Sequence, residues 1–163
     1  ETAVGGKAEE FAAVLCVRQE PKLIYEISLC KEQGEYQHYR TTDRLFSVTG
    51  RDEIPNFSGN IRYQAKLMLQ TGKSCVLDLG AVGETAEVFL NGQAVGIRLA
   101  PPYRFEITKW IKEGENDLTV FVTNSLGFEK RDPISRFLVM EPSGLLGPVQ
   151  INYYQTNQEE NKQ

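Results

Sequence analysis

The chain has 163 residues, of which 40% are hydrophobic and 25% charged, a composition typical of one compact soluble domain and not of a disordered, fibrous or membrane protein. A net charge of −4, with 18 basic residues spread along the sequence, argues against nucleic acid and anionic membrane surfaces as partners. The apolar stretches fall far short of the ~20 residues that a spanning helix requires, and no secretion signal opens the sequence.

The sequence predicts a single folded unit. Residues 1–10 are small and charged, and we expect a flexible N-terminal segment there. Residues 155–163 are wholly polar and are expected to form a tail. Between them, residues 11–154 contain no repeat, low-complexity block or linker, which indicates one β-sandwich domain.

Hydrophobic alternation is the main signal along the chain. Residues 61–69 carry an apolar side chain at every odd position, as expected for a strand with one buried face. Asn91-Gly92 separates two apolar runs, 87–90 and 93–97, and favours a type I′ hairpin. Further strands are expected at 11–17, 23–29, 75–79, 104–107, 117–123 and 149–154.

One segment has a helical pattern. Residues 108–113 are expected to form a short helical turn, with Thr108 as its N-cap and Gly114 just past its end. The sequence thus contains about nine or ten short strands and no long helix. This pattern predicts an all-β protein with a jelly-roll β-sandwich fold.

Cys16, Cys30 and Cys75 are an odd number of cysteines, with spacings that match neither a zinc cluster nor a redox pair. Each lies in an alternating apolar run, where a free cysteine behaves as a small buried hydrophobe. The alternative is a Cys16–Cys30 disulfide between neighbouring strands.

The common catalytic signatures are absent from the sequence. His38 is the only histidine, and its place between aromatic residues favours a structural or surface role. Asp and Glu are plentiful, at 22 residues, but no pair stands out for glycoside hydrolysis. Asp78 lies in an apolar stretch and is expected to be a polar group that needs partners. No catalytic residue is predicted.

Several motifs in order resemble a known family over residues 55–151. They are Pro55-Asn-Phe-Ser-Gly-Asn-Ile-Arg-Tyr63, Leu77-Asp-Leu-Gly80, Ala86-Glu-Val-Phe-Leu-Asn-Gly92, Pro102-Tyr-Arg-Phe-Glu-Ile-Thr108, Lys112-Glu-Gly-Glu-Asn116, Leu118 to Asn124 and Ser143 to Val149. This series resembles the galactose-binding-like, jelly-roll, sugar-binding domains of glycoside hydrolases of the family-two and α-L-rhamnosidase type. Residues 1–54 match more loosely, with 25–29 and 45–49 where such domains have their first strands.

The resemblance implies an accessory role. In such enzymes the catalytic carboxylates lie in a separate barrel, which takes about 250 residues. We therefore expect a non-catalytic, carbohydrate-associated domain of a bacterial, polysaccharide-degrading glycoside hydrolase, similar to rhamnosidases, β-galactosidases or glucuronidases. It would bind glycan or support the catalytic domain. The alternative is a purely structural packing module without sugar affinity, and a small free-standing enzyme is a third hypothesis.

A sugar site is predicted in the loops at one end of the sandwich. Aromatic rings stack on sugar C–H faces, while amides and guanidinium groups bond to hydroxyls, which selects Tyr103, Arg104, Asn124, Phe128 and Arg131. Relatives often continue the strand with an Asn-Arg pair, where this chain has Asn124-Ser125. The resemblance implies no cofactor, is compatible with a structural calcium ion, and suggests a periplasmic or extracellular protein.

Overall fold

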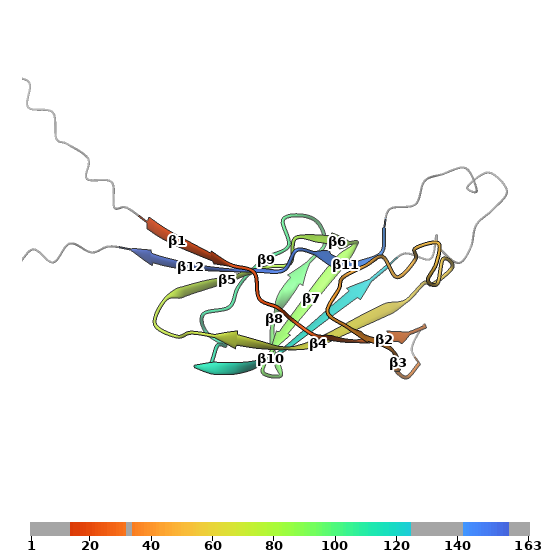
Figure 1. Cartoon of the computed structure of the whole chain (residues 1–163), viewed down its shortest axis with the longest axis horizontal. Helices are drawn as coiled ribbons and strands as arrows, with labels where there is room; N and C mark the ends of the chain where they lie inside the picture. The colour runs from red at the N-terminus through yellow and green to blue at the C-terminus, as the bar shows by residue number, and fades with distance from the viewer. Residues whose placement is uncertain (1–13, 32–33, 125–141, 157–163) are drawn as a thin grey trace, which may run out of the picture.

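A computed structural model describes residues 14–31, 34–124 and 142–156. These residues form twelve β-strands and no helix. A four-stranded sheet, in the order β1-β12-β5-β9, faces a six-stranded sheet, in the order β3-β2-β4-β10-β7-β8. A two-stranded sheet, β11-β6, lies at one side of them (Figure 1). The expected all-β jelly-roll sandwich is therefore confirmed.

The strand bounds follow the alternating runs closely. The four-stranded sheet contains β1 (Val14–Gln19), β12 (Gln150–Thr156), β5 (Ser74–Asp78) and β9 (Arg104–Glu106). The six-stranded sheet contains β3 (Gln37–Thr42), β2 (Tyr25–Cys30), β4 (Asn60–Leu69), β10 (Gly114–Thr123), β7 (Thr85–Leu90) and β8 (Gln93–Arg98). The small sheet contains β6 (Ala81–Gly83) and β11 (Gly144–Gly147).

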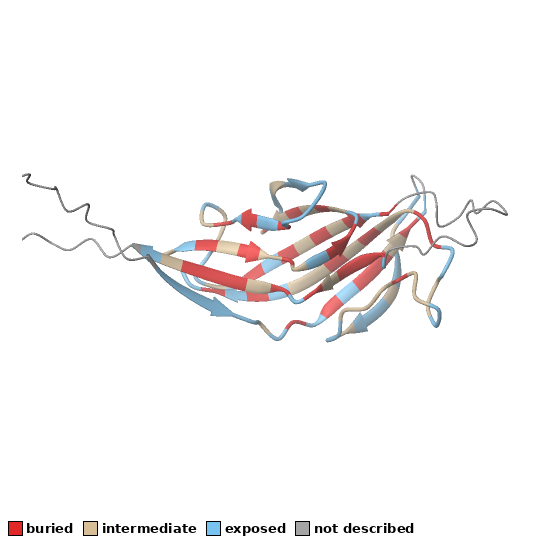
Figure 2. Ribbon diagram, turned by 90° about the horizontal axis from the view of Figure 1, so that it is seen from above, coloured by how far each residue is buried: buried red, intermediate tan, exposed pale blue. Residues whose placement is uncertain are grey.

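The antiparallel pair β4 and β10 forms the middle of the larger sheet. The two strands pair over their full length, from Asn60 opposite Thr123 to Leu69 opposite Gly114. Buried and more exposed residues alternate along the long strands, as the banded colours of Figure 2 show. One face of this sheet is therefore the wall of the core, and the other is the outside of the sandwich.

The core lies between the two large sheets. The six-stranded sheet contributes Ile61, Tyr63, Leu67, Val88, Val120 and Val122, and the four-stranded sheet contributes Leu77, Phe105, Ile151 and Tyr153. Tyr63 is 1% exposed, and its hydroxyl oxygen accepts a hydrogen bond from the backbone N–H of Leu145 at 3.0 Å. Burial raises the pKa of Tyr63, so the phenol stays neutral and joins β11 to the core.

The predicted hairpin is confirmed as β7–β8. Asn91 and Gly92 have φ angles of 52° and 76°, the two left-handed residues that a type I′ turn requires. The neighbouring prediction is wrong, since no helix forms at 108–113. Residues 108–110 form a turn, closed by the Trp110 N–H donating to the Ile107 carbonyl at 2.9 Å. Thr108 caps no helix, because its hydroxyl oxygen accepts the Cys75 N–H at 2.8 Å.

The N-terminal half departs from expectation in two ways. Residues 45–49 form no strand but part of a loop, and an unpredicted edge strand, β3, precedes them. The small sheet was also missed. Its glycines explain it, because a Cβ on Gly83 would lie 1.8 Å from the Pro142 carbonyl oxygen. Only glycine allows the two backbones to approach so closely.

The cysteine prediction is right in part. No disulfide joins any of Cys16, Cys30 and Cys75. Cys30 and Cys75 are buried, as expected, but Cys16 is exposed, because β1 is an edge strand on which every described side chain faces solvent. Cys16 and Cys30 lie in different sheets, so they are not on the neighbouring strands that a disulfide was expected to join.

The proposed chain ends fall largely outside the described residues. This is so for the whole of 1–10 and for 157–163. Gln155 and Thr156 belong to β12. The division at residues 11 and 154 stays a prediction.

Candidate functional site

The loop end of the sandwich holds two of the predicted sugar-binding residues. Tyr103 precedes β9, and its hydroxyl donates a hydrogen bond to the carbonyl of Glu84, the residue before β7. Asn124 follows β10, whose last residue, Thr123, pairs with Thr85 at the start of β7. The fold thus brings Tyr103 and Asn124 to the same end, as predicted. Phe128 and Arg131 lie outside the described residues.

At this loop end the side-chain polar groups of Tyr103 and Asn124 form hydrogen bonds within the protein. Asn124 is 6% exposed; its Oδ1 accepts the Gly59 N–H at 2.7 Å, and its Nδ2 donates to the Phe57 carbonyl at 2.9 Å. Tyr103 is 4% exposed and uses its hydroxyl on Glu84. Buried polar groups that already have hydrogen-bond partners in the protein hold loops together and leave few donors or acceptors for a ligand. Sugar binding by Tyr103 and Asn124 stays a prediction.

Arg104 is the predicted site residue that faces solvent. Its Nε donates to Oδ2 of Asp78 at 2.7 Å, and the two residues are also cross-strand partners between β9 and β5. The other carboxylate oxygen of Asp78 accepts the Gly80 N–H at 2.9 Å. Asp78 therefore has the partners that its apolar sequence context predicted it would need, and Arg104 keeps further guanidinium donors on the surface.

Another pair of motif residues is structural, at the opposite end of β7. Asn91 Nδ2 donates to the Trp110 carbonyl at 2.9 Å and to Oδ1 of Asn116 at 2.8 Å. Asn116 Nδ2 in turn donates to the carbonyls of Lys112 and Gly114, each at 2.8 Å. This amide network ties the hairpin turn to the turn before β10. The Asn-Gly and Gly-Glu-Asn motifs are therefore explained by folding alone.

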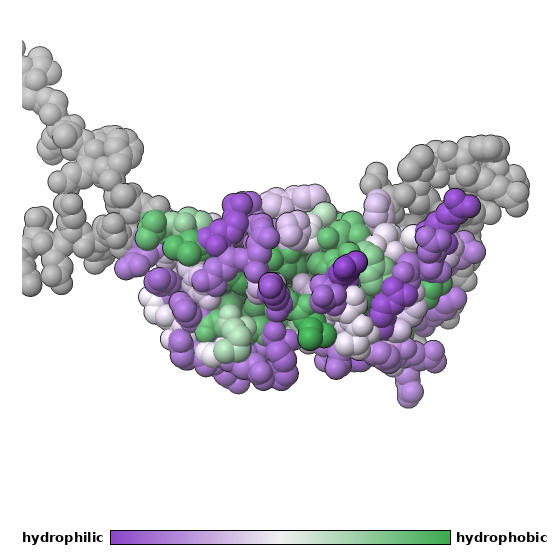
Figure 3. Space-filling view, in the orientation of Figure 1, coloured by the Kyte–Doolittle hydropathy of each residue, from purple (hydrophilic) through white to green (hydrophobic). Residues whose placement is uncertain are grey.

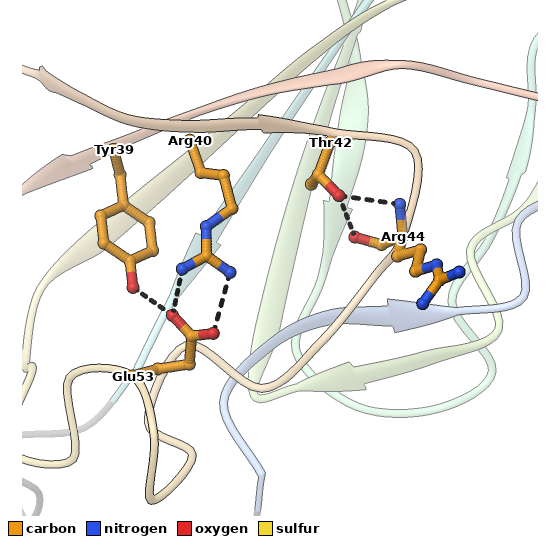
Figure 4. Close-up of polar contacts among 5 residues, drawn as sticks. All are labelled: Tyr39, Arg40, Thr42, Arg44 and Glu53. Atoms are coloured by element: carbon orange, nitrogen blue, oxygen red, sulfur yellow. Dashed lines mark hydrogen bonds and ion pairs between the residues drawn. The ribbon is translucent and has the colours of Figure 1, made fainter.

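A charged cluster fastens the loop after β3, as Figure 4 shows. The Arg40 guanidinium forms two parallel hydrogen bonds to Glu53, each 2.9 Å long, and the Tyr39 hydroxyl donates to the same carboxylate. These hydrogen bonds, first from Tyr39 and then from Arg40, lower the pKa of Glu53. The guanidinium carbon of Arg40 also lies 4.8 Å from the ring centre of Phe46. The guanidinium group therefore has both a carboxylate partner for its charge and an aromatic ring against its planar face.

Sequence reasoning missed a group on the outside of the six-stranded sheet. We call it the aromatic face, and it consists of Tyr36, Arg62, Phe89 and Phe121. Ring centres lie 5.8 Å apart for Tyr36 and Phe121 and 5.6 Å apart for Phe89 and Phe121. The available signal was the placing of aromatic residues at the outward positions of two alternating strands, where polar residues are usual.

Two grooves border these surfaces. The larger, of about 670 Å³, is lined by Lys22, Ile24, Glu26, Gln64, Lys66, Asp117 and Thr119, among others. The smaller, of about 420 Å³, includes His38 and Tyr39. His38 itself is exposed, consistent with a surface residue. Within residues 14–31, 34–124 and 142–156, no three His, Cys, Asp or Glu side chains gather as metal ligands.

Comparisons with known proteins find similarity to glycoside hydrolases. No family model matches the chain. A protein of Formosa agariphila described as "Putative beta-glucuronidase" is 31% identical, with 67% of this chain and 13% of that protein covered. A rhamnosidase from Novosphingobium sp. PP1Y is 25% identical with a TM-score of 0.67, over 93% of this chain and 16% of its own.

A third comparison concerns the fold alone. A Ruminococcus gnavus β-glucuronidase matches 85% of this chain and 28% of its own, with a TM-score of 0.65 at 15% identity. The chain thus spans between 13% and 28% of the length of these three relatives. The resemblance over residues 55–151 and the jelly-roll fold that it implied are confirmed.

Proposed function

Because this chain is a jelly-roll domain of the kind found in glycoside hydrolases, we propose that it is a non-catalytic accessory domain of a longer enzyme of that class. The observation that carries the proposal is the coverage: 93% of the chain corresponds to 16% of a rhamnosidase. A domain that fills so small a part of its relative leaves ample length for a catalytic barrel of about 250 residues.

Three of the described carboxylates are bound within the domain, which supports a non-catalytic role for them. A glycosidase requires two carboxyl groups about 5–10 Å apart, facing one cleft. Here Glu53 is bound by Arg40 and Tyr39, Asp78 by Arg104 and Gly80, and Asp117 by Lys66. These three carboxylates hold together strands and loops of the domain itself.

We further propose that the domain supports the catalytic domain by packing against it, at the edge formed by β1. Leu15 is 55% exposed and Val17 39% exposed. Hydrophobic atoms gather where β1 and β12 run together toward one end of the molecule (Figure 3). An apolar edge strand is a liability in an isolated domain, and a neighbouring domain would cover it.

The experiment compares two proteins on the same substrates. The 163-residue chain and the natural-length protein are each incubated with p-nitrophenyl β-D-glucuronide and p-nitrophenyl α-L-rhamnoside. We expect turnover of one of them by the natural-length protein and none by the chain. Turnover by the chain alone would overturn the accessory role, and so would a natural-length protein without glycosidase activity.

A second comparison tests the packing edge. Val17→Asp in the natural-length protein is expected to lower the temperature at which activity is lost, because it places a carboxylate in an apolar contact. Leu99→Asp is the matched control, since Leu99 is also exposed, at 76%, but follows β8 and lines neither groove. Equal effects of the two substitutions would exclude β1 as the packing edge.

The compartment follows as part of the same proposal. The structure contains no helix, in the part of the chain that it describes, long and apolar enough to cross a membrane. Because glycoside hydrolases of the kind that the chain resembles are typically exported, we propose an exported, periplasmic or extracellular enzyme. Fractionation of cells that carry the natural-length gene tests this, and activity confined to the cytoplasm would contradict it.

A further inference from the structure

We propose that Asn91 is a site of spontaneous deamidation through the backbone nitrogen of Gly92, and that the amide network of Asn91 and Asn116 protects it in the folded domain. The site lies at the end of β7 opposite the loop end, and it involves neither the β1 edge nor a partner. It therefore goes beyond the accessory role proposed above and can be tested independently of it.

The reaction needs only the Asn91-Gly92 dipeptide and water. The Gly92 nitrogen attacks Cγ of the Asn91 side chain, a new C–N bond forms, and the bond from Cγ to Nδ2 breaks. The amide nitrogen takes the proton of the Gly92 N–H and leaves as ammonia. Water then opens the resulting five-membered succinimide ring at one of its two carbonyl carbons, which gives aspartate or isoaspartate without any oxidant, reductant or cofactor.

The turn is open to this chemistry from the glycine side. Gly92 is exposed, and a Cβ built on it would meet nothing within 4 Å. Because glycine carries no Cβ, no side chain screens its nitrogen from the neighbouring Cγ. Asparagine is among the residues that heat damages most readily, and the exposed Asn-Gly turn is therefore the expected place of such damage.

The folded domain holds both polar atoms of the Asn91 side chain. Nδ2 donates to the Trp110 carbonyl at 2.9 Å and to Oδ1 of Asn116 at 2.8 Å, while Oδ1 accepts the Asp117 N–H at 3.0 Å. Attack by the Gly92 nitrogen makes Cγ tetrahedral and expels Nδ2. The reaction must therefore break three hydrogen bonds that the unfolded chain does not have.

Asn116 keeps these partners in place. It is 1% exposed, and its Nδ2 donates to the carbonyls of Lys112 and Gly114, each at 2.8 Å. Its Oδ1 accepts the Lys112 N–H at 2.8 Å in addition to the Asn91 amide. A buried amide with all its donors and acceptors in use is rigid, so it fixes the Asn91 side chain away from the reactive geometry that ring closure needs.

The product cannot rejoin the network. An ionised aspartate has acceptors but no donor, and at position 91 it would face the Trp110 carbonyl and Oδ1 of Asn116, which are also acceptors. Isoaspartate in addition lengthens the main chain by one carbon in a tight turn. Once ammonia has left, the link between the hairpin turn and the turn before β10 is lost permanently.

Peptide mapping of the 163-residue chain tests the proposal. The chain is incubated at pH 8 and 37 °C, in buffer and in guanidinium chloride that unfolds it, and is then digested in acid for mass spectrometry. We expect position 91 to be deamidated at least about tenfold more slowly in the folded chain, since 1.4 kcal/mol of opening free energy corresponds to a factor of ten. Equal rates in the two solutions, or no deamidation in guanidinium chloride, would overturn the proposal.

Two variants separate the network from global stability. Asn116→Ala, in buffer, should raise the deamidation rate about fivefold, the effect of losing one hydrogen bond of roughly 1 kcal/mol. Asn124→Ala is the matched control, because it removes another buried amide at the far end of the same sheet, and it should leave the rate at position 91 near that of the wild type. If Asn116→Ala fails to fold, Asn116→Ser replaces it. An equal rise in both variants would mean that global unfolding exposes the site and that the network does not protect it.

The consequence of the modification is tested with Asn91→Asp, which has the same side chain as one product. We expect its thermal unfolding midpoint to lie below that of Asn56→Asp, which adds the same charge at an exposed position. Equal midpoints would contradict the loss of the network on deamidation. Neither experiment uses a substrate or the natural-length protein, so this proposal and the accessory role fail separately.

Discussion

The loop end and the aromatic face differ in where their polar groups are directed. At the loop end, Tyr103 and Asn124 use their side-chain donors and acceptors on the backbone of Glu84, Phe57 and Gly59. On the aromatic face, Arg62 holds a fixed orientation over Tyr36, yet its Nε has no partner in the described chain. Residue type alone cannot separate a loop-closing amide from a ligand-binding one, because both need the same donors and acceptors.

Two arginines sharpen the contrast within one sheet. Arg40 on β3 has a bidentate carboxylate and aromatic rings around it, which together meet its hydrogen-bonding needs. Arg62 on β4 has an aromatic ring and one long hydrogen bond. The first arginine is a clamp for the loop that contains Glu53, whereas the second is held mainly by its contact with the Tyr36 ring.

The largest effect is expected at the loop end. Asn124→Ala removes an acceptor for Gly59 and a donor for Phe57 in a buried site, and should lower the free energy of unfolding by about 2–4 kcal/mol. Urea denaturation followed by circular dichroism measures it. Asn56→Ala, at an exposed position, should change it by less than about 0.5 kcal/mol. Equal values for the two variants would contradict the structural role of Asn124.

Tyr103→Phe isolates the hydroxyl at the same end. It keeps the buried ring and removes the hydrogen bond to the Glu84 carbonyl, so we expect a loss of about 1 kcal/mol in the free energy of unfolding. Any sugar affinity of the chain should stay the same. Weaker sugar binding with unchanged stability would reverse this assignment and restore Tyr103 as a ligand-binding residue.

The Arg40 clamp predicts a pH dependence. Hydrogen bonds from the Tyr39 hydroxyl and then from Arg40 lower the pKa of Glu53 from a usual value of 4.5, so the folded state favours the carboxylate. The stability that Glu53 adds over Glu53→Gln is therefore fully present above about pH 4.5 and lost as the pH falls through the lowered pKa. Thermal unfolding of both proteins between pH 7 and pH 3 measures the difference. An advantage that grows in acid would contradict the clamp.

The smallest effect is expected at Arg62. Arg62→Met removes a buried Nε that has no partner among the described residues, and it keeps the packing of the apolar stem. The free energy of unfolding should change by less than about 0.5 kcal/mol, in urea denaturation. Arg40→Met should be clearly more destabilising, because it leaves Glu53 without its bidentate partner. Equal losses for the two variants would remove the difference between the arginines.

Much of the fold follows from alternation and turn chemistry. The runs at 61–69 and 117–123 predicted the central strands β4 and β10, because their inward positions are all apolar and the core selects one register. Asn91-Gly92 predicted its hairpin because both residues readily adopt the left-handed φ angles of a type I′ turn. The edge strand β3, with the sequence Gln-His-Tyr-Arg-Thr-Thr, has no such pattern, since neither of its faces is fully buried.

The missed features depend on contacts distant in sequence. The turn at 108–110 has too few residues to be a stable helix by itself, and Cys75 draws Thr108 into another hydrogen bond. The sheet of β6 and β11 is set by the close approach of Gly83 to Pro142. The end at which Tyr103 and Asn124 meet could be predicted, but their buried partners could not, because those lie on other loops.

The unequal exposure of the three thiols gives this protein a built-in reporter of its own folding. Cys16 is the only one of the three that is exposed to solvent. Burial shields the Cys75 sulfur from reagents and also raises the pKa of its thiol to about 11, and both effects lower its reactivity. A thiol-specific reagent at neutral pH should count one reactive group in the native chain and three in the denatured chain. The rate at which the second and third groups react then measures the opening of each sheet separately, since Cys30 lies in one and Cys75 in the other.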